Sequence, residues 1–256
     1  IAPIGPHITL FENRLADFLG ENTQVAALQS GTAAIHLGLQ LLGVQNGDEV
    51  LCQSLTFVAS VNPILYLGAT PVFVGSEKET WNMCPDALEK AILNRLENGI
   101  QPKAILLVHL YGMPAKMDEI VTLSRKYNIP ILEDAAEALG STYHGKPCGT
   151  FGDFGVLSFN GNKIITTSGG GGLICQSETA KEKAIFLATQ AKEDAIHYEH
   201  KQIGYNYRMS NISASIGLGQ LEVLSKHIQL RKQNHLFYKQ LFDTLSEVTL
   251  HQESNE

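Results

Sequence analysis

The sequence predicts an α/β fold in which a mainly parallel sheet is covered by helices. Short apolar runs alternate along the chain with longer segments whose apolar residues recur at helical spacing. The short runs are apolar at consecutive positions, as strands buried on both faces require. With 256 residues, of which 44% are hydrophobic, the chain is long enough to bury the core of a large globular domain.

The predicted elements follow one another from the N-terminus. Residues 1–20 are expected to form an irregular arm and then a first helix, which Gly20 ends. From Ser210 onward the pattern becomes one long helix that continues toward Leu245. Between these segments we expect strands at 25–28, 49–52, 70–74, 104–109, 129–134, 154–159 and 171–175, and helices at 33–42, 57–67, 85–96 and 117–127.

Composition excludes several classes of function. The net charge of −7 argues against nucleic acid or an anionic membrane as the main partner. The sequence contains no apolar run of about 18 residues, so no membrane span is expected. The four cysteines are widely spaced without a CxxC pair, which is typical of reduced thiols in a cytoplasmic protein.

The most informative stretch runs from Ser158 to Gly172 and contains a single lysine, Lys163, followed by four consecutive glycines. Burial disfavours an ammonium group, and a neutral lysine amine attacks carbonyl carbon to form a Schiff base. Glycines allow the backbone to approach a flat ligand closely. The alternative interpretation is an ordinary surface lysine before a flexible loop.

A second candidate site is the segment Ser30-Gly31-Thr32, between the strand at 25–28 and the helix at 33–42. Free backbone N–H groups and the helix dipole favour an anion at such a helix start, and two hydroxyls add donors. The alternative is a plain helix cap, because serine and threonine cap helices routinely.

Asp134 ends an apolar strand and could cap a helix or pair with a protonated ring nitrogen. Phe57 could stack on the face of such a ring or belong to the core. Ligands of open parallel sheets bind beyond the carboxyl ends of the strands, where the Ser30 segment, Asp134, Ser158 and Lys163 all fall. An anion cradle, a carboxylate for a ring nitrogen and a lysine for an aldehyde together predict a pyridoxal phosphate site.

The sequence resembles the DegT/DnrJ/EryC1/StrS sugar aminotransferases from Ile1 to about Leu245. This resemblance implies the type I fold of pyridoxal phosphate-dependent transferases, as in aspartate aminotransferase. It also implies an arm and first helix at 1–20, a large cofactor-binding domain at 21–210, and a long helix at 211–256 leading to a small C-terminal domain that is largely absent. The stretches that carry the resemblance are SGTAA (30–34), TFVASVNPILYLGATPVFV (56–74), VHLYGMPAKMDEI (108–120), EDAAEALGS (133–141), GTFGDFGVLSFNGNKIITTSGGGG (149–172) and GYNYRMSN (204–211).

The resemblance assigns roles to individual positions. Lys163 matches the lysine that forms the Schiff base with the cofactor, and Asp134 matches the partner of the ring nitrogen. Ser158 and Thr32 match phosphate ligands, and Ser30 and Gly31 lie in the same cradle.

Further positions match the ring and substrate contacts of the family. Phe57 matches the aromatic residue that covers the ring, and Glu137 stands where many relatives carry Gln or His near the ring hydroxyl. Asn206 matches an asparagine that reaches into the site of a neighbouring subunit, which implies a homodimer with shared active sites. Ile1 and Ala2, together with Gly31 and Asn206, are expected to contact the sugar nucleotide.

The implied activity is transfer of an amino group from L-glutamate, which becomes 2-oxoglutarate, to C4 of a nucleotide-linked 4-keto-6-deoxy sugar for glycan biosynthesis. Within the family, the chain resembles the branch that makes UDP-N-acetylbacillosamine. The motifs that carry this resemblance are NGNKIITTSGGG, Thr189-Gln190-Ala191 and His197-Tyr198-Glu199-His200. GDP-perosamine synthases and dTDP-sugar aminotransferases are the alternatives.

Other classes of function remain open on the sequence alone. Related dehydratases replace the lysine with His, and the presence of Lys163 argues against them. Some relatives were first described as regulators, so an incomplete or non-catalytic family member is a further alternative. His197 and His200 could bind a metal, but no third ligand accompanies them, and we predict a loop that shapes the sugar site instead.

Overall fold

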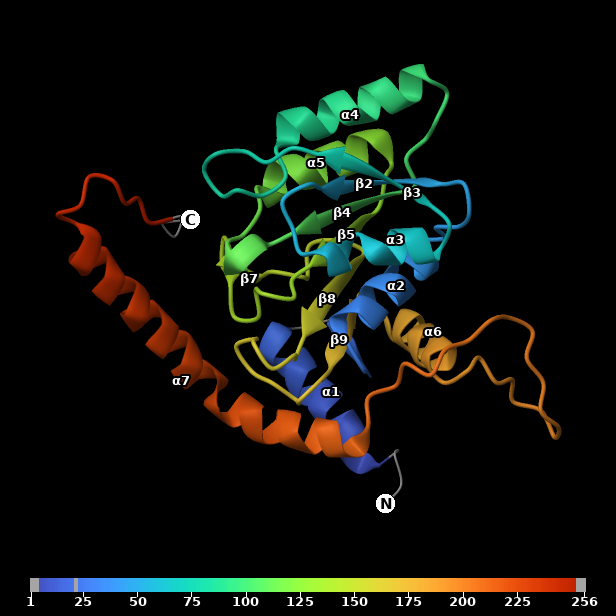
Figure 1. Ribbon diagram of the computed structural model, residues 1–256. Helices are drawn as coiled ribbons and strands as arrows, with labels where there is room; N and C mark the ends of the chain where they lie inside the picture. The colour runs from blue at the N-terminus through green and yellow to red at the C-terminus, as the bar shows by residue number, and fades with distance from the viewer. Residues whose placement is uncertain (1–4, 21–22, 252–256) are drawn as a thin grey trace.

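A computed structural model describes residues 5–20 and 23–251 of the chain. Within these residues a seven-stranded sheet has the order β1-β9-β8-β5-β4-β2-β3, and a short hairpin is formed by β6 and β7 (Figure 1). The elements are α1 (Pro6–Leu19), β1 (Gln24–Leu28), α2 (Gly31–Leu41), β2 (Glu49–Gln53), the 3₁₀ turn η1 (Val58–Ser60), α3 (Asn62–Tyr66), β3 (Thr70–Val74), α4 (Pro85–Glu97), β4 (Ala104–Val108), the 3₁₀ turn η2 (Leu110–Gly112), α5 (Met117–Tyr127), β5 (Ile131–Asp134), β6 (Thr142–Tyr143), β7 (Lys146–Pro147), β8 (Phe154–Ser158), β9 (Gly171–Cys175), α6 (Glu178–Ala188) and α7 (Asn211–Phe242).

The sheet is mainly parallel. Strands β8, β5, β4, β2 and β3 pair with one another in parallel, whereas β9 pairs antiparallel with both β1 and β8. The carboxyl ends of all the strands except β9 therefore lie at one edge, and the amino end of β9 joins them there. This is the edge at which an open sheet binds its ligands.

The alternation of side chains along each strand divides the core between two faces. On one face, Leu132 of β5 packs with α2, α3 and α6. On the other face, Ile131 packs with α4 and α5, while α1 and α7 cover the end of the sheet formed by β1, β9 and β8. A strand that is covered on both faces reads as a continuous apolar run, and β4 is buried at every position.

Two segments extend from this body in Figure 1: the C-terminal half of α7 and the loop between α6 and α7. The first half of α7 packs against α1 with Ala214 and Leu224, whereas Leu236, Phe237 and Leu241 in the second half are exposed. None of the helices in the described ranges is long and apolar enough to span a membrane.

The α/β class, the parallel sheet and the long C-terminal helix are confirmed. The single helix expected at 57–67 is wrong in detail, because η1 ends at Ser60 and α3 begins at Asn62. Pro63 explains the break: it favours the first turn of a helix and lacks the N–H that a helix interior needs. The apolar pattern of the sequence predicted neither α6 nor the antiparallel direction of β9.

Candidate active site

The carboxyl edge of the sheet brings together the Ser30 segment and Ser158, which lie far apart in the sequence. A methyl group added at Gly31 would lie 3.2 Å from Ser158 Cβ, so the start of α2 and the end of β8 are in contact. A methyl group at Gly171 would collide with the backbone of Ser30 and Gly31. The first residue of β9 is therefore packed directly against the start of α2.

Helix α2 begins at this point with a side-chain cap. Ser30 Oγ accepts a hydrogen bond of 3.0 Å from the Ala33 N–H, so the capping interpretation is correct for the Ser30 side chain. The amides of Gly31 and Thr32 belong to the first turn, where the helix itself offers them no acceptor. These amides and the Ser158 hydroxyl form a set of donors suited to a phosphate group.

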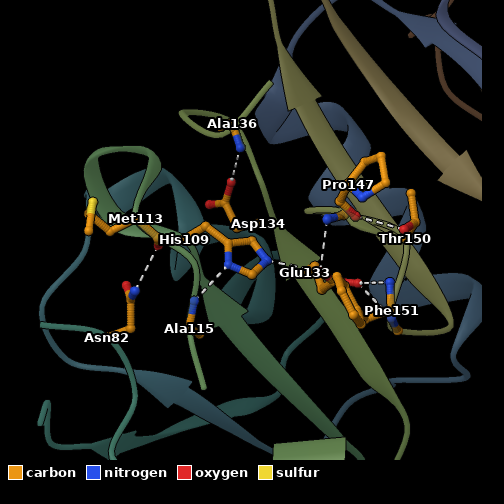
Figure 2. Close-up of polar contacts among 12 residues, drawn as sticks. Asn82, His109, Met113, Ala115, Glu133, Asp134, Ala136, Pro147, Thr150 and Phe151 are labelled. Atoms are coloured by element: carbon orange, nitrogen blue, oxygen red, sulfur yellow. Dashed lines mark hydrogen bonds and ion pairs between the residues drawn. The ribbon is translucent and has the colours of Figure 1, made fainter. Parts of the chain in front are cut away.

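Asp134 is the last residue of β5, and the residue is only 6% exposed. No helix follows it directly; Oδ1 accepts from the Ala136 N–H at 3.1 Å (Figure 2). Ser60 Oγ donates to Oδ2 at 2.7 Å. Burial raises the pKa of Asp134 above its usual range, while the bonds from Ser60 and Ala136 and the charge of Lys163 oppose that rise.

Lys163 lies in the turn that follows β8, and its side chain is 15% exposed. Its Nζ lies 3.3 Å from Glu137 Oε1. The other oxygen of Glu137 accepts a 2.8 Å hydrogen bond from the Tyr111 N–H. The lysine is thus partly buried and paired with a carboxylate.

The remaining predicted contacts take no part in the hydrogen bonds described above. Phe57 directly precedes η1 and is 73% exposed, so the core alternative does not hold for this chain. Asn206 is exposed and forms an isolated bridge with Thr189. The predicted contacts of Ile1 and Ala2 fall outside the described residues.

The His197 and His200 pair does not form a metal centre in the described part of the chain. His200 Nδ1 donates to the Gln190 carbonyl at 2.9 Å, and His197 Nε2 lies 3.7 Å from Glu199. Among the described residues, no group of three or more His, Cys, Asp or Glu is arranged to hold a metal ion.

Sequence reasoning missed Ser60 and the backbone amide of Tyr111. Ser60 follows β2, and a hydroxyl after a parallel strand is the same signal that singled out Ser158. The Tyr111 amide carries no signal in the sequence, because any residue type supplies a backbone N–H. Glu133 and His109, which form a buried pair beside the site, were also not singled out.

The residues present fit pyridoxal phosphate. The donors at the start of α2 and Ser158 suit its phosphate, the buried carboxylate of Asp134 suits its ring nitrogen, and Lys163 suits its aldehyde. The close packing of Gly171 against Ser30 holds the first of these groups in place.

Comparison with known proteins agrees with this geometry. The profile of the DegT/DnrJ/EryC1/StrS aminotransferase family matches residues 1–256. The chain is 57% identical over 239 residues to EpsN of Bacillus subtilis (strain 168), provisionally named a pyridoxal phosphate-dependent aminotransferase, covering 93% of this chain and 61% of EpsN. It is 43% identical over 257 residues to the GDP-perosamine synthase of Escherichia coli O157:H7, covering 100% of this chain and 68% of the synthase.

Solved structures show the same likeness. A Streptococcus pneumoniae protein, provisionally named a sugar aminotransferase and solved in its PLP-form, superimposes with a TM-score of 0.84 at 30% identity. The match covers 97% of this chain and 68% of that protein. The family, the type I fold and pyridoxal phosphate as cofactor are therefore as the sequence predicts. The chain belongs to the DegT/DnrJ/EryC1/StrS aminotransferase family.

Proposed function

We propose that the protein is an aminotransferase that moves an amino group from L-glutamate to C4 of a 4-keto-6-deoxy sugar linked to UDP. The observation that carries the proposal is the convergence of Lys163, Asp134 and the donors at the start of α2 on one edge of the sheet. The UDP-linked sugar is favoured by the sequence of residues 160–171. The 43% identity to a GDP-perosamine synthase favours a GDP-linked sugar as the second candidate.

When bound, pyridoxal phosphate supplies an aldehyde that takes up the amino group and a ring that accepts electrons. The amides of Gly31 and Thr32 and the Ser158 hydroxyl would hold its phosphate. Asp134 would keep a proton on the ring nitrogen, and the exposed Phe57 would cover the ring face.

Lys163 is the proton carrier of the proposed reaction. Its Nζ takes a proton from the α-carbon of glutamate in the first half and gives a proton to C4 of the sugar in the second. Glu137 faces this amine at 3.3 Å and orients it. One side chain thereby serves both half-reactions.

A homodimer with shared sites completes the proposal. Leu55, Phe57 and Val58 follow β2, Tyr111 follows β4, and all four are exposed at the carboxyl edge of the sheet. Apolar side chains gathered beside a site are typical of an interface, and a second copy of the chain would cover them. Its Asn206 would then reach the site.

The function is tested by glutamate-dependent amination of UDP-, GDP- and dTDP-linked 4-keto-6-deoxy sugars. Lys163→Ala should abolish the visible absorption band of the bound cofactor. It should also lower the turnover rate by about a thousandfold or more. Lys126→Ala is the matched control, because Lys126 pairs with Glu89 on the surface, away from the site. Amination that survives in Lys163→Ala overturns the proposal, and equal rates with all three nucleotides overturn UDP specificity. Loss of a sugar oxygen in place of amine gain would indicate a dehydratase, and binding without turnover a non-catalytic member.

Shared sites are tested by mixing two inactive variants, Lys163→Ala and Asn206→Ala. Random pairing makes half of the dimers mixed, and each mixed dimer has one intact site out of two, so about a quarter of the wild-type activity should return. A mixture that stays inactive, although subunits are shown to exchange, overturns the shared site.

A further inference from the structure

A buried carboxylate lies directly beside Asp134 in the sequence and on the opposite face of the sheet. Glu133 is fully buried, and its two oxygens accept four hydrogen bonds (Figure 2). Oε2 accepts from His109 Nε2 at 2.9 Å and the Gly149 N–H at 2.8 Å. Oε1 accepts from the Phe151 and Gly152 N–H groups at 2.6 and 2.5 Å. Four donors on one buried carboxylate fix the position of both of its oxygens.

His109 connects this carboxylate to the loop that follows β4. The Ala115 N–H donates to His109 Nδ1 at 3.1 Å, so Nδ1 is the acceptor nitrogen and Nε2 carries the proton given to Glu133. Burial lowers the pKa of this imidazole, whereas Cys148 and Glu133 raise it to about 10. A second proton at Nδ1 would nevertheless face the Ala115 N–H, so the geometry favours the neutral ring. The imidazole is fully buried, and both of its nitrogens are used. His109, the first residue of the loop 109–115, is therefore bonded both to Glu133 of β5 and to Ala115 at the end of the loop.

This loop contains a strained residue, which the surrounding hydrogen bonds hold in place. Tyr111 has φ 55° and Gly112 has φ 81°, and Tyr111 is a bulky residue in a conformation that favours glycine. Asn82 adds bonds to Leu110 and Met113 from the other side of the loop.

The strained position has a direct link to the site. The Tyr111 N–H donates to Glu137, and the other oxygen of Glu137 lies 3.3 Å from Lys163 Nζ. The conformation of the loop thus sets where the carboxylate that faces the lysine is held.

We propose that His109 and Glu133 are positioning residues of the active site, acting through the Tyr111 amide and Glu137 on Lys163. The buried pair fixes the loop 109–115 to β5, the strand that carries Asp134. The same set of hydrogen bonds thereby fixes the Lys163 amine and the Asp134 carboxylate relative to each other. This inference rests on the proposed function.

Two substitutions of His109 separate its two bonds. In His109→Asn the side-chain oxygen takes the place of Nδ1 and can accept from Ala115, but no donor reaches Glu133. In His109→Gln the amide nitrogen takes the place of Nε2 and can donate to Glu133, but the Ala115 N–H has no acceptor. Asp153→Ala is the matched control: Asp153 accepts from the Ile131 N–H of the same strand and has no bond to the loop.

The experiment combines amide hydrogen exchange of the full chain with stopped-flow reaction of Lys163 with pyridoxal phosphate. In His109→Gln, exchange at Tyr111 and Ala115 should rise about tenfold while Phe151 and the β4 amides stay protected. In both His109 variants the visible band should form about tenfold more slowly, because the Lys163 amine is held less exactly. In Asp153→Ala, the exchange rate of the Tyr111 amide and the rate of band formation should both stay within about twofold of wild type.

Either of two results overturns the inference: a band rate within twofold of wild type in both His109 variants, or exchange that rises equally at Tyr111 and throughout β4. If the wild-type chain forms no visible band, the proposed function fails. Exchange at Tyr111 in His109→Gln still decides the link to the loop, since that link does not depend on turnover.

Discussion

Ser60 Oγ donates a 2.7 Å hydrogen bond to Asp134 Oδ2, and Thr56 Oγ1 lies 2.7 Å from Ser60 Oγ. The pair joins the turn after β2 to the end of β5, across β4, which lies between them in the sheet. Because burial raises the pKa of Asp134 and the Ser60 bond opposes that rise, this hydroxyl helps to keep the carboxylate ionised at the position where a ring nitrogen would be protonated.

Ser60→Ala should therefore raise the pKa of Asp134 further. A bond to a charged group contributes about 1.5 to 3 kcal/mol, so the acidic limb of the pH profile of kcat/KM should move upward by about one pH unit. Ser54→Ala is the control, since Ser54 is exposed in the same connection. An acidic limb at the same pH in wild type and Ser60→Ala would show that Asp134 does not depend on this bond.

Asp134→Asn separates catalysis from stability. The folded-state pKa of Asp134 lies above the unfolded value, so between these two values the folded chain binds more protons and stability falls as pH rises. Asparagine removes that loss and can keep an acceptor for Ala136 and a donor for Ser60. The cofactor-free variant should match or exceed wild-type stability at neutral pH by about 1 kcal/mol, while turnover is lost.

Urea unfolding of both proteins at pH 5 and pH 7.5 measures this difference. The gain from Asp134→Asn should be larger at pH 7.5, where more of the wild-type carboxylate is charged. A variant that is less stable than wild type, and more so at pH 7.5, would contradict a net cost of the buried charge.

Glu137→Gln tests the contact with Lys163. Glutamine keeps an oxygen for the Tyr111 N–H, but its amide nitrogen then faces Nζ and offers the lysine no acceptor. Because the amine is held less exactly, we expect cofactor-free Lys163 to react with pyridoxal phosphate about tenfold more slowly, as in the His109 variants. Stopped-flow absorbance measures the rate, and exposed Glu182→Gln is the control. A rate within about twofold of wild type would show that Glu137 does not position the lysine.

The main features of the fold and the centre of the site could be predicted from the sequence for one physical reason. Strands buried on both faces read as apolar runs, and in a parallel sheet their carboxyl ends share an edge. The sequence therefore predicts that Asp134, Ser158 and the segment before α2 lie near one another. The capping role of Ser30 was one of two open interpretations, since both need the same residue type.

Other features depend on contacts that no local pattern encodes. The approach of Glu137 to Lys163 joins two loops, and its geometry is set by the amide of Tyr111. The antiparallel direction of β9 leaves no trace in an apolar run that is buried on both faces. Helix α6 had a readable start in Ser177, whose side chain accepts from the Ala180 N–H, but its apolar residues are too few to give a clear helical period.

The four glycines from Gly169 to Gly172 offer a matched pair for the last prediction. A methyl group at Gly171 would collide with backbone atoms of Ser30 and Gly31, whereas one at Gly169 would meet no atom within 4 Å. Backbone cannot move aside as a flexible side chain can. Gly171→Ala should therefore lower the free energy of unfolding by about 3 kcal/mol or displace the start of α2, and Gly169→Ala should change it by less than about 0.5 kcal/mol.

Urea unfolding distinguishes these two variants, and titration with pyridoxal phosphate adds a second measurement. If the glycine serves to bring β9 against the start of α2, the surviving fold of Gly171→Ala should bind the cofactor about tenfold more weakly, because the amides of Gly31 and Thr32 no longer converge with Ser158. Equal stability and equal affinity in the two variants would mean that these glycines form an ordinary loop. The distinction matters because the same composition fits both interpretations, and only the position of each glycine against its neighbours separates them.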